Sequence, residues 1–456
     1  MTSLLPLLPD LPDITPMSLY RGMALDRASF LAQVEAVAQA LPDVEAAINL
    51  CLDRHWFAVS FLACIRRGIL TLLPNSNAPQ HLADLRQRHP GSIALGDQAE
   101  TLMPDCDWLR VDEAPACRPS NETAARADIP SAQVLARFYT SGSTGEPKAC
   151  NKTLAHLLAG HQAAVSRIWG MTGGPCPVIG TSSFRHMFGF EATLTLPLWG
   201  GGMLSPNTPF FPADVAQALA ELPAPALLVT TPYHLRKILE ADIAFPRCAG
   251  LLSATAPLSA ELARQAEARF AAPLLEIYGS TELGMMATRR TSCTTDWHLL
   301  DGFSLRSTEA GFEANGPALA SPQLLHDLIE PLDATHFRLV DRSSNLINVV
   351  GKRSSLGVLN QVLQGLPGVE DGVFYLPPSP ASQQADATRL AAFVVAPGLS
   401  PADITAGLRA HIDPVFLPRP IVMLPTLPRD ANAKLSQSAL QALLVAHQGA
   451  RTSAPT

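Results

Sequence analysis

The chain has 456 residues, of which 47% are hydrophobic and 16% charged, and its net charge is −7. This length exceeds that of a single-core domain, and the acidic balance without a basic run argues against a protein that binds nucleic acid. The longest apolar stretch, Trp56 to Leu73, is broken by Arg66 and Arg67, so we predict no membrane span.

The N-terminal segment has no basic residue before Arg21 and is interrupted by prolines. We therefore predict that it is not a secretory signal and that the protein is cytoplasmic. The eight cysteines lie scattered, without a Cys-x-x-Cys pair or metal-ligand spacing, which predicts reduced thiols.

A glycine- and hydroxyl-rich segment, Tyr139 to Lys148, reads Tyr-Thr-Ser-Gly-Ser-Thr-Gly-Glu-Pro-Lys. The apolar run Val134–Tyr139 predicts a strand before it, and Cys150–Leu158 can continue as a helix, so we expect a strand-to-helix turn. Such turns bind anions in α/β folds, and backbone N–H groups, hydroxyls and the Lys148 ammonium can converge on a polyphosphate. The spacing is neither that of a Walker loop nor Gly-x-Gly-x-x-Gly. A flexible surface loop is the alternative.

Further motifs follow in chain order. They are Ser182–Gly189 (Ser-Ser-Phe-Arg-His-Met-Phe-Gly), Ser253–Leu258 (Ser-Ala-Thr-Ala-Pro-Leu), Tyr278–Glu282 (Tyr-Gly-Ser-Thr-Glu) and Leu427–Leu435 (Leu-Pro-Arg-Asp-Ala-Asn-Ala-Lys-Leu). Together with the 139–148 loop, these segments resemble the adenylate-forming superfamily of acyl-CoA synthetases, peptide-synthetase adenylation domains and luciferases. The resemblance extends over nearly the whole chain.

The resemblance implies a site for ATP and Mg²⁺. In the family, the loop binds phosphates, the Ala-rich turn packs beside adenine, and the threonine of Tyr-Gly-x-Thr-Glu contacts phosphate. The implied nucleotide-binding residues are Thr140, Ser141, Gly142, Ser143, Thr144, Gly145, Lys148, Ala254, Thr255, Ala256, Tyr278, Gly279, Ser280, Thr281, Asp327 and Arg342. Glu282 is the implied magnesium ligand.

The assignment of Asp327 and Arg342 rests on their separation of 342 − 327 = 15 residues. The family uses a similar separation between an aspartate that binds the ribose hydroxyls and an arginine that reaches the nucleotide. His326 and Asp341 stand where the family usually has glycine. A capping or loop aspartate is the alternative for Asp327.

The C-terminal motif implies that Lys434 is the adenylation lysine, although Ala433 replaces the usual glycine. The chain has only five lysines, and two of them, Lys148 and Lys434, fall on motif positions. Ser344 occupies the family's hinge position, where an aspartate or lysine is usual. We expect an AMP-binding N-terminal domain over residues 1–342 and a C-terminal lid domain over residues 343–456.

The expected fold is α/β, with a large N-terminal domain of β-sheets flanked by helices and a small, mobile α+β lid. In the lid, strands are predicted near 346–350, 372–375 and 389–395, and helices near 401–412 and 436–446. From residue 345 onward there are eight basic and six acidic residues, so this part carries +2.

The acid-binding region is implied by the Ser182–Gly189 segment, whose histidine lines the acyl tunnel in acyl- and aryl-CoA ligases. His186 is the matching residue, with a core histidine as the alternative, and Arg185 is interpreted as a surface residue. Amino-acid-activating domains place an aspartate here to pair with the substrate's ammonium. None is present. We therefore predict a fatty or aromatic acid without an α-amine, beside the apolar segments 227–231 and 285–286.

The predicted function is ATP-dependent activation of a carboxylic acid to an acyl-adenylate, followed by transfer to a phosphopantetheine thiol of coenzyme A or an acyl carrier protein. The catalytic residues would be Lys434, Glu282, Thr281 and His186. The compact length is similar to that of small ligases that load acyl or aryl starters in aryl-polyene-type pathways. Two alternatives stay open: a nucleotide-binding regulator without turnover, and an enzyme with a non-thiol acceptor, as in luciferases.

Overall fold

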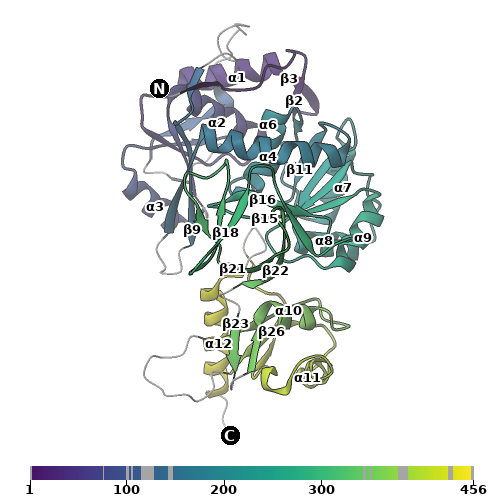
Figure 1. Ribbon diagram of the computed structural model, residues 1–456. Helices are drawn as coiled ribbons and strands as arrows, with labels where there is room; N and C mark the ends of the chain where they lie inside the picture. The colour runs from purple at the N-terminus through teal and green to yellow at the C-terminus, as the bar shows by residue number, and fades with distance from the viewer. Residues whose placement is uncertain are drawn as a thin grey trace. The chain divides into compact units, whose positions relative to one another are not determined.

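The computed structural model describes residues 3–74, 77–98, 102–103, 106–114, 128–141, 147–342, 346–349, 352–377, 389–429 and 435–452. Contacts divide the chain into two compact units (Figure 1). The first comprises Met1–Leu324 with Asp333–His336, and the second comprises Leu325–Leu332 with Phe337–Thr456. The domain boundary at residue 342 stays a prediction.

One sheet of the first unit has the strand order β10-β9-β5-β4-β6-β7, and every pairing in it is parallel except β9 with β10. Its strands are β4 (Ala46–Asn49), β5 (Leu70–Leu73), β6 (Ile93–Gly96), β7 (Trp108–Arg110), β9 (Val134–Ser141) and β10 (Pro147–Thr153), and the helices between them and before them are α1 (Arg27–Ala40), α2 (Arg54–Arg67), α3 (Pro79–Arg88) and the 3-10 turn η1 (Val111–Glu113). Strands β4 and β6 are buried at every residue, which accounts for their apolar sequences without alternation.

The second sheet of the first unit runs β17-β16-β15-β14-β13-β11-β12-β2-β3. Its strands are β2 (Pro16–Tyr20), β3 (Met23–Asp26), β11 (Pro177–Gly180), β12 (Met203–Leu204), β13 (Leu227–Thr230), β14 (Gly250–Ser253), β15 (Leu274–Ser280), β16 (Gly284–Arg289) and β17 (Asp296–Leu299). The strands β15, β14, β13, β11, β12 and β2, in this spatial order, pair in parallel with their neighbours. The pairings of β15, β16 and β17 at one end and of β2 with β3 at the other are antiparallel. Two short sheets complete the unit: β1 (Leu4–Pro6) with β8 (Asp128–Pro130), and β18 (Ser304–Thr308), β19 (Gly311–Asn315) and β20 (Gln323–Leu324).

Helices connect the parallel strands of this second sheet. They are α5 (Met187–Phe190), the π-helical turn η2 (Glu191–Thr195), α6 (Leu196–Gly200), α7 (Pro212–Ala220), α8 (Pro232–Glu240) and α9 (Ala260–Phe270), while α4 (Leu154–Thr172) leads from β10 of the first sheet into β11. Helices α8 and α9 lie side by side (Figure 1). The segment β13-α8-β14-α9-β15 therefore forms two consecutive strand-helix-strand units. The carboxyl ends of its parallel strands lie at the same edge of the sheet.

The boundaries of α4 show that the expected strand-to-helix turn after Tyr139 is wrong. Residues 147–153 form strand β10, which pairs antiparallel with β9 and places Lys148 opposite Thr140. The helix begins only at Leu154, because the Thr153 side chain accepts the His156 N–H and caps it. The phosphate loop thus belongs to a β-hairpin.

A fully buried arginine joins the two large sheets of the first unit. Arg54 begins α2, and its guanidinium donates to the carbonyl oxygens of Ser205 (2.5 Å), Asn207 (2.7 Å) and Gly180 (3.2 Å) and to the Thr208 hydroxyl (3.2 Å). Burial lowers the pKa of Arg54 to about 10. The guanidinium remains charged at neutral pH, and its rigid fork matches several acceptors at once.

The second unit is a small α+β arrangement, as predicted. It contains β21 (Asp327–Pro331), β22 (His336–Arg342, apart from its first residue), β23 (Leu346–Val349), β24 (Lys352–Ser355), α10 (Leu356–Gln364), β25 (Asp371–Tyr375), β26 (Ala391–Val395), α11 (Pro401–Arg409), the 3-10 turn η4 (Pro414–Phe416), β27 (Ile421–Met423) and α12 (Gln437–Thr452). Leu363, Phe374, Val394 and Leu408 lie in its core. The predicted strands and helices of this part are confirmed.

Candidate active site

The carboxyl edge of the parallel strands gathers hydroxyl side chains. Strands β11, β13 and β14 end at Gly180, Thr230 and Ser253, and the Thr181 and Thr230 hydroxyls lie 2.9 Å apart. The Ser182 and Ser253 hydroxyls are buried, and neither has a hydrogen-bond partner among the residues that the structure describes. Ligands of α/β folds bind outside this edge, and buried polar groups without partners need explanation, so these hydroxyls mark a candidate binding surface.

The predicted adenine-side turn, Ala254–Ala256, leaves β14 at this edge. Thr255 has φ = +80°, a conformation that costs a β-branched residue on the order of 1–3 kcal/mol and that clusters at functional sites. The turn is tied to the neighbouring strand, because the Leu258 N–H donates to the buried Glu276 carboxylate at 3.2 Å. Arg289 also donates to Glu276 at 2.8 Å, which favours its charged form although burial raises the pKa of this carboxyl.

The Tyr278–Glu282 motif forms the end of β15 and the turn into β16. Gly279 must be glycine, because a Cβ there would lie 2.0 Å from the Gly284 carbonyl oxygen. The Ser280 hydroxyl donates to Glu282 Oε2 at 3.0 Å and accepts the Leu283 N–H at 3.2 Å. Tyr278 is buried, whereas the Glu282 carboxylate is half-buried at the turn. It is thus held locally and open to a ligand.

Strand β10 brings the phosphate-loop hairpin against this same turn. The Lys152 ammonium donates to the Glu282 carbonyl oxygen at 2.8 Å, and the Cys150 thiol donates to the Thr281 carbonyl oxygen at 3.5 Å. Lys148 lies on β10 with an exposed side chain. The strand that leaves the 139–148 motif therefore contacts the Tyr278–Glu282 motif, more than a hundred residues away in sequence.

Part of the predicted loop, residues 142–146, lies outside the described residues, and with it the predicted binding residues Gly142, Ser143, Thr144 and Gly145. Thr140 and Ser141 are described as backbone of β9. Their roles in phosphate binding stay predictions.

A buried glutamate that the sequence reasoning missed lies behind the turn. Glu191 is 9% exposed, and its Oε2 accepts the Met285 N–H at 2.9 Å. Burial raises the pKa of its carboxyl to about 7, while Lys152 and the Met285 N–H oppose that rise. Lys152 is itself only 4% exposed. The rarity of lysine, used above for Lys148 and Lys434, could have drawn attention to it.

His186 is half-buried and stands directly before α5. Its backbone N–H donates to the Ser183 carbonyl oxygen at 3.3 Å. The interpretation of Arg185 as a surface residue is wrong: the side chain is partly buried and donates to the carbonyl oxygens of Leu50 (2.8 Å) and Cys51 (2.7 Å). Because Arg185 is committed to these carbonyls, it supports the segment rather than extending into solvent.

The remaining predicted residues belong to the second unit. Asp327 and Arg342 are register partners in the β21–β22 hairpin, so the fifteen-residue separation reflects two positions directly across an antiparallel pair. Lys434 and Ser344 lie outside the described residues. The roles of all four stay predictions.

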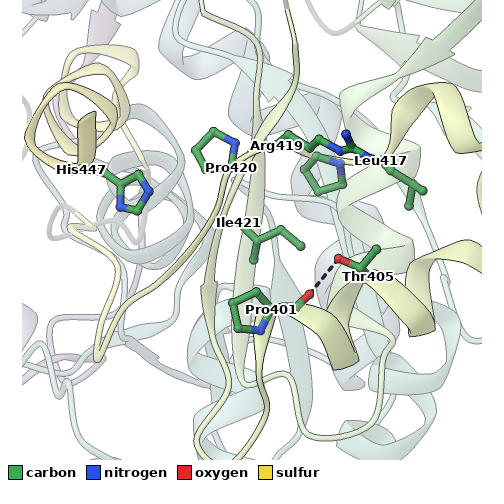
Figure 2. Close-up of a pocket in the computed structure, with 8 residues that line it drawn as sticks. Pro401, Thr405, Leu417, Arg419, Pro420, Ile421 and His447 are labelled. Carbon is green, nitrogen blue, oxygen red and sulfur yellow. Dashed lines mark hydrogen bonds between the residues drawn. The ribbon is translucent and has the colours of Figure 1, made fainter. Parts of the chain in front are cut away.

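The second unit also has a pocket of about 440 Å³ that the sequence did not predict (Figure 2). It is lined by the start of α11, residues 417–421 and His447, and the Thr405 hydroxyl donates to the Pro401 carbonyl oxygen at 2.7 Å beside it. No predicted site residue lines this pocket, so we assign it no role in the reaction.

The donors at the first unit's carboxyl edge fit a magnesium ion carried by a nucleotide. Among the described residues, no cluster of three or more His, Cys, Asp or Glu side chains could hold a metal by itself. Mg²⁺ commonly binds through one or two carboxylates together with substrate phosphates and water. Glu282 supplies a carboxylate of this kind. Over the part of the chain that the structure describes, no helix has the length and apolar character needed to cross a membrane.

The fold and this edge site define a protein of the adenylate-forming class. The model of the AMP-binding enzyme family matches residues 22–311, and the chain belongs to that family. It is 32% identical over 277 residues to the 4-coumarate–CoA ligase of Rhodobacter capsulatus, covering 60% of this chain and 67% of the relative. It is 25% identical over 439 residues to the p-hydroxybenzoic acid–AMP ligase FadD22 of Mycobacterium marinum, covering 86% of this chain and 61% of the relative.

Solved structures confirm the predicted fold. ATP-bound MatB from Rhodopseudomonas palustris superimposes with a TM-score of 0.80 at 18% identity, covering 96% of this chain and 97% of MatB. The o-succinylbenzoate coenzyme A synthetase MenE from Bacillus subtilis, in complex with ATP and magnesium ion, gives a TM-score of 0.79 at 18% identity, covering 94% of this chain and 97% of MenE.

Proposed function

We propose that this chain is an AMP-forming acid–thiol ligase that activates a carboxylic acid with ATP and passes the acyl group to a phosphopantetheine thiol. The observation that carries the proposal is the meeting of β10 with the Thr281–Glu282 turn at the carboxyl edge of the parallel strands. This contact joins the strand that follows the predicted phosphate loop to the backbone of the residue predicted to bind magnesium, in a chain of the AMP-binding family.

In the first step, the substrate carboxylate attacks the α-phosphorus of ATP. A new O–P bond forms as the bond to pyrophosphate breaks, and the products are acyl-adenylate and pyrophosphate. The Lys148 ammonium and the loop donors would hold the phosphates, and Lys434 would stabilise the charge that develops between the acid and the α-phosphate. Magnesium, when bound, would neutralise charge on the phosphates, with Glu282 as its protein ligand.

In the second step, a thiol attacks the acyl carbon of the adenylate. A C–S bond forms, the C–O bond to AMP breaks, and the thiol proton is released to solvent. The Thr281 hydroxyl and the half-buried His186 would bind and orient the adenylate, and the hinge at Ser344 would let the predicted C-terminal domain, residues 343–456, change orientation between the steps.

The substrate class proposed is an aromatic or fatty acid without an α-amine. Residues 182–189 supply a histidine and no aspartate, so the site lacks the counter-ion that a buried ammonium would require. Hydroxycinnamic and hydroxybenzoic acids are the first to test, because relatives of this chain are named for such acids. The mildly basic C-terminal part would suit an acidic carrier protein as well as coenzyme A.

The test is a panel of aryl and fatty acids assayed for ATP-dependent pyrophosphate release, repeated with coenzyme A and with a holo acyl carrier protein. Release with at least one acid and thioester with one thiol would support the proposal. No release with any acid would favour a nucleotide-binding regulator, and release without thioester would favour a non-thiol acceptor.

Asp327 can be tested through ligand-linked stability. A non-hydrolysable acyl-adenylate analogue should raise the melting temperature of the wild type by mass action. Asp327→Ala should lose most of that increase, because a charge-assisted hydrogen bond contributes about 1.5 to 3 kcal/mol. Glu330→Ala, an exposed change on the same strand, is the matched control.

Equal increases in Asp327→Ala and wild type would place the ribose contact elsewhere. Asp333 would then be the candidate to test, although its carboxylate already accepts the Thr335 N–H (2.7 Å) and the His336 N–H (2.8 Å) and so has a structural role of its own.

A further inference from the structure

Two buried ionisable side chains hold the backbone on both sides of the Glu282 turn. Lys152 on β10 donates to the Glu282 carbonyl oxygen at 2.8 Å. Glu191, the first residue of η2, accepts the Met285 N–H at 2.9 Å. The segment between these hydrogen bonds is only Glu282 to Met285, so its position is fixed from two different secondary-structure elements.

The backbone of this segment is shaped to admit the Glu191 carboxylate. Gly284 has φ = +70°, and a Cβ at this position would lie 2.7 Å from Glu191 Oε1. A side chain at residue 284 would therefore both strain the backbone and displace the carboxylate. Glycine at this place allows an ionisable group to approach the turn from inside the protein.

Burying both charges is costly for folding. Lys152 is 4% exposed and Glu191 is 9% exposed, and the two interact electrostatically. Replacement of a buried charge pair by apolar residues is often neutral or stabilising, so packing alone does not require such a pair. Hydrogen bonds from charged groups are shorter and stronger than neutral ones, and they fix the atoms that they contact.

We propose that Lys152 and Glu191 are positioning residues that hold the Glu282 carboxylate in place for magnesium and the nucleotide phosphates. This inference rests on the proposed role of Glu282 and adds a supporting layer behind it. Removing a side chain that orients a metal ligand without itself contacting the metal commonly lowers metal affinity about 10- to 100-fold.

The experiment compares Lys152→Met, Glu191→Gln and the double variant with wild type. Its first readout is the melting temperature without ligand. Its second is the magnesium-dependent part of the increase in melting temperature caused by ATP, which requires no acid substrate. Its third is the apparent KM for Mg²⁺ and kcat in pyrophosphate release. Lys237→Met with Glu240→Gln, an exposed Lys–Glu pair on α8, is the matched control.

We expect Lys152→Met to lower the melting temperature, because it leaves a buried carboxylate without its cation. The double variant should recover much of that stability, yet its magnesium-dependent increase should stay small and its apparent KM for Mg²⁺ should rise about 10- to 100-fold. Glu191→Gln keeps an acceptor for the Met285 N–H at nearly the same volume, so it should fold. If Lys152→Met fails to fold, the magnesium-dependent increase of Glu191→Gln tests the positioning role. Glu191→Gln should show a smaller loss of the same kind.

The inference would be overturned if the double variant or Glu191→Gln showed the same magnesium-dependent increase in melting temperature as wild type. Lys152 and Glu191 would then have a purely structural role. Absence of that increase in wild type would overturn it too. If wild type shows the increase but releases no pyrophosphate with any acid, the proposed reaction fails while the positioning role can still be decided from the melting temperatures.

Discussion

Replacing Glu282 by glutamine should slow ATP-dependent pyrophosphate release by roughly a hundredfold or more. The change removes an anionic oxygen of the proposed magnesium ligand while keeping nearly the same volume. The Ser280 hydroxyl can still donate to the amide oxygen, so the turn should keep its shape. The loss should therefore appear in magnesium-dependent chemistry and not in folding.

The measurement is the rate of pyrophosphate release over a magnesium titration, with the melting temperature as a check on folding. Glu309→Gln, an exposed glutamate in the turn between β18 and β19, is the matched control and should behave as wild type. An unchanged rate of Glu282→Gln at limiting magnesium would remove this residue from the metal site.

Replacing Lys434 by alanine should cost the adenylation step about 3 to 4 kcal/mol, the range for losing one preorganised electrostatic contact. The motif assigns this lysine to the C-terminal domain, so it can stabilise adenylation in only one orientation of that domain. Thioester formation from a synthetic acyl-adenylate should stay within about a few-fold of wild type, since that step would use another orientation.

The two half-reactions should be compared in one preparation of Lys434→Ala. Lys352→Ala is the matched control, because Lys352 is the other lysine of the second unit and pairs with Asp413 at the surface. Equal losses in both half-reactions would mean that Lys434 acts through folding or docking, and alternation of the C-terminal domain would lose its main support.

The nucleotide motifs were visible in the sequence because each is a short continuous segment. The Tyr278–Glu282 motif is recognised from five consecutive residues, and its Gly279 permits the close approach of the Gly284 carbonyl oxygen. The β10 strand was missed because residues 147–153 show no alternation of apolar and polar side chains: Ala149 and Cys150 are followed by Asn151 and Lys152. Thr153 directly before Leu154 was the available signal for the true start of the helix.

The pairing of Lys152 with Glu191 could not be predicted, because burial of an ionisable group depends on which distant elements pack around it. Glu191 follows an apolar segment, and a glutamate there reads equally well as an exposed position on a helix. Arg185 was misjudged for the same reason. Its acceptors are the main-chain carbonyls of Leu50 and Cys51. Every residue has such a carbonyl, so the sequence does not reveal these hydrogen bonds.

Arg54 has a consequence for cooperativity. Its guanidinium belongs to the helix that follows β4, yet its acceptors include Gly180, the last residue of β11, and Ser205, directly after β12 of the other large sheet. Opening either sheet alone would leave a buried cation without acceptors, which is among the costliest defects a protein interior can carry. The two sheets should therefore exchange their amide hydrogens as one block, and native-state hydrogen exchange would contradict this if one sheet opened at much lower free energy than the other.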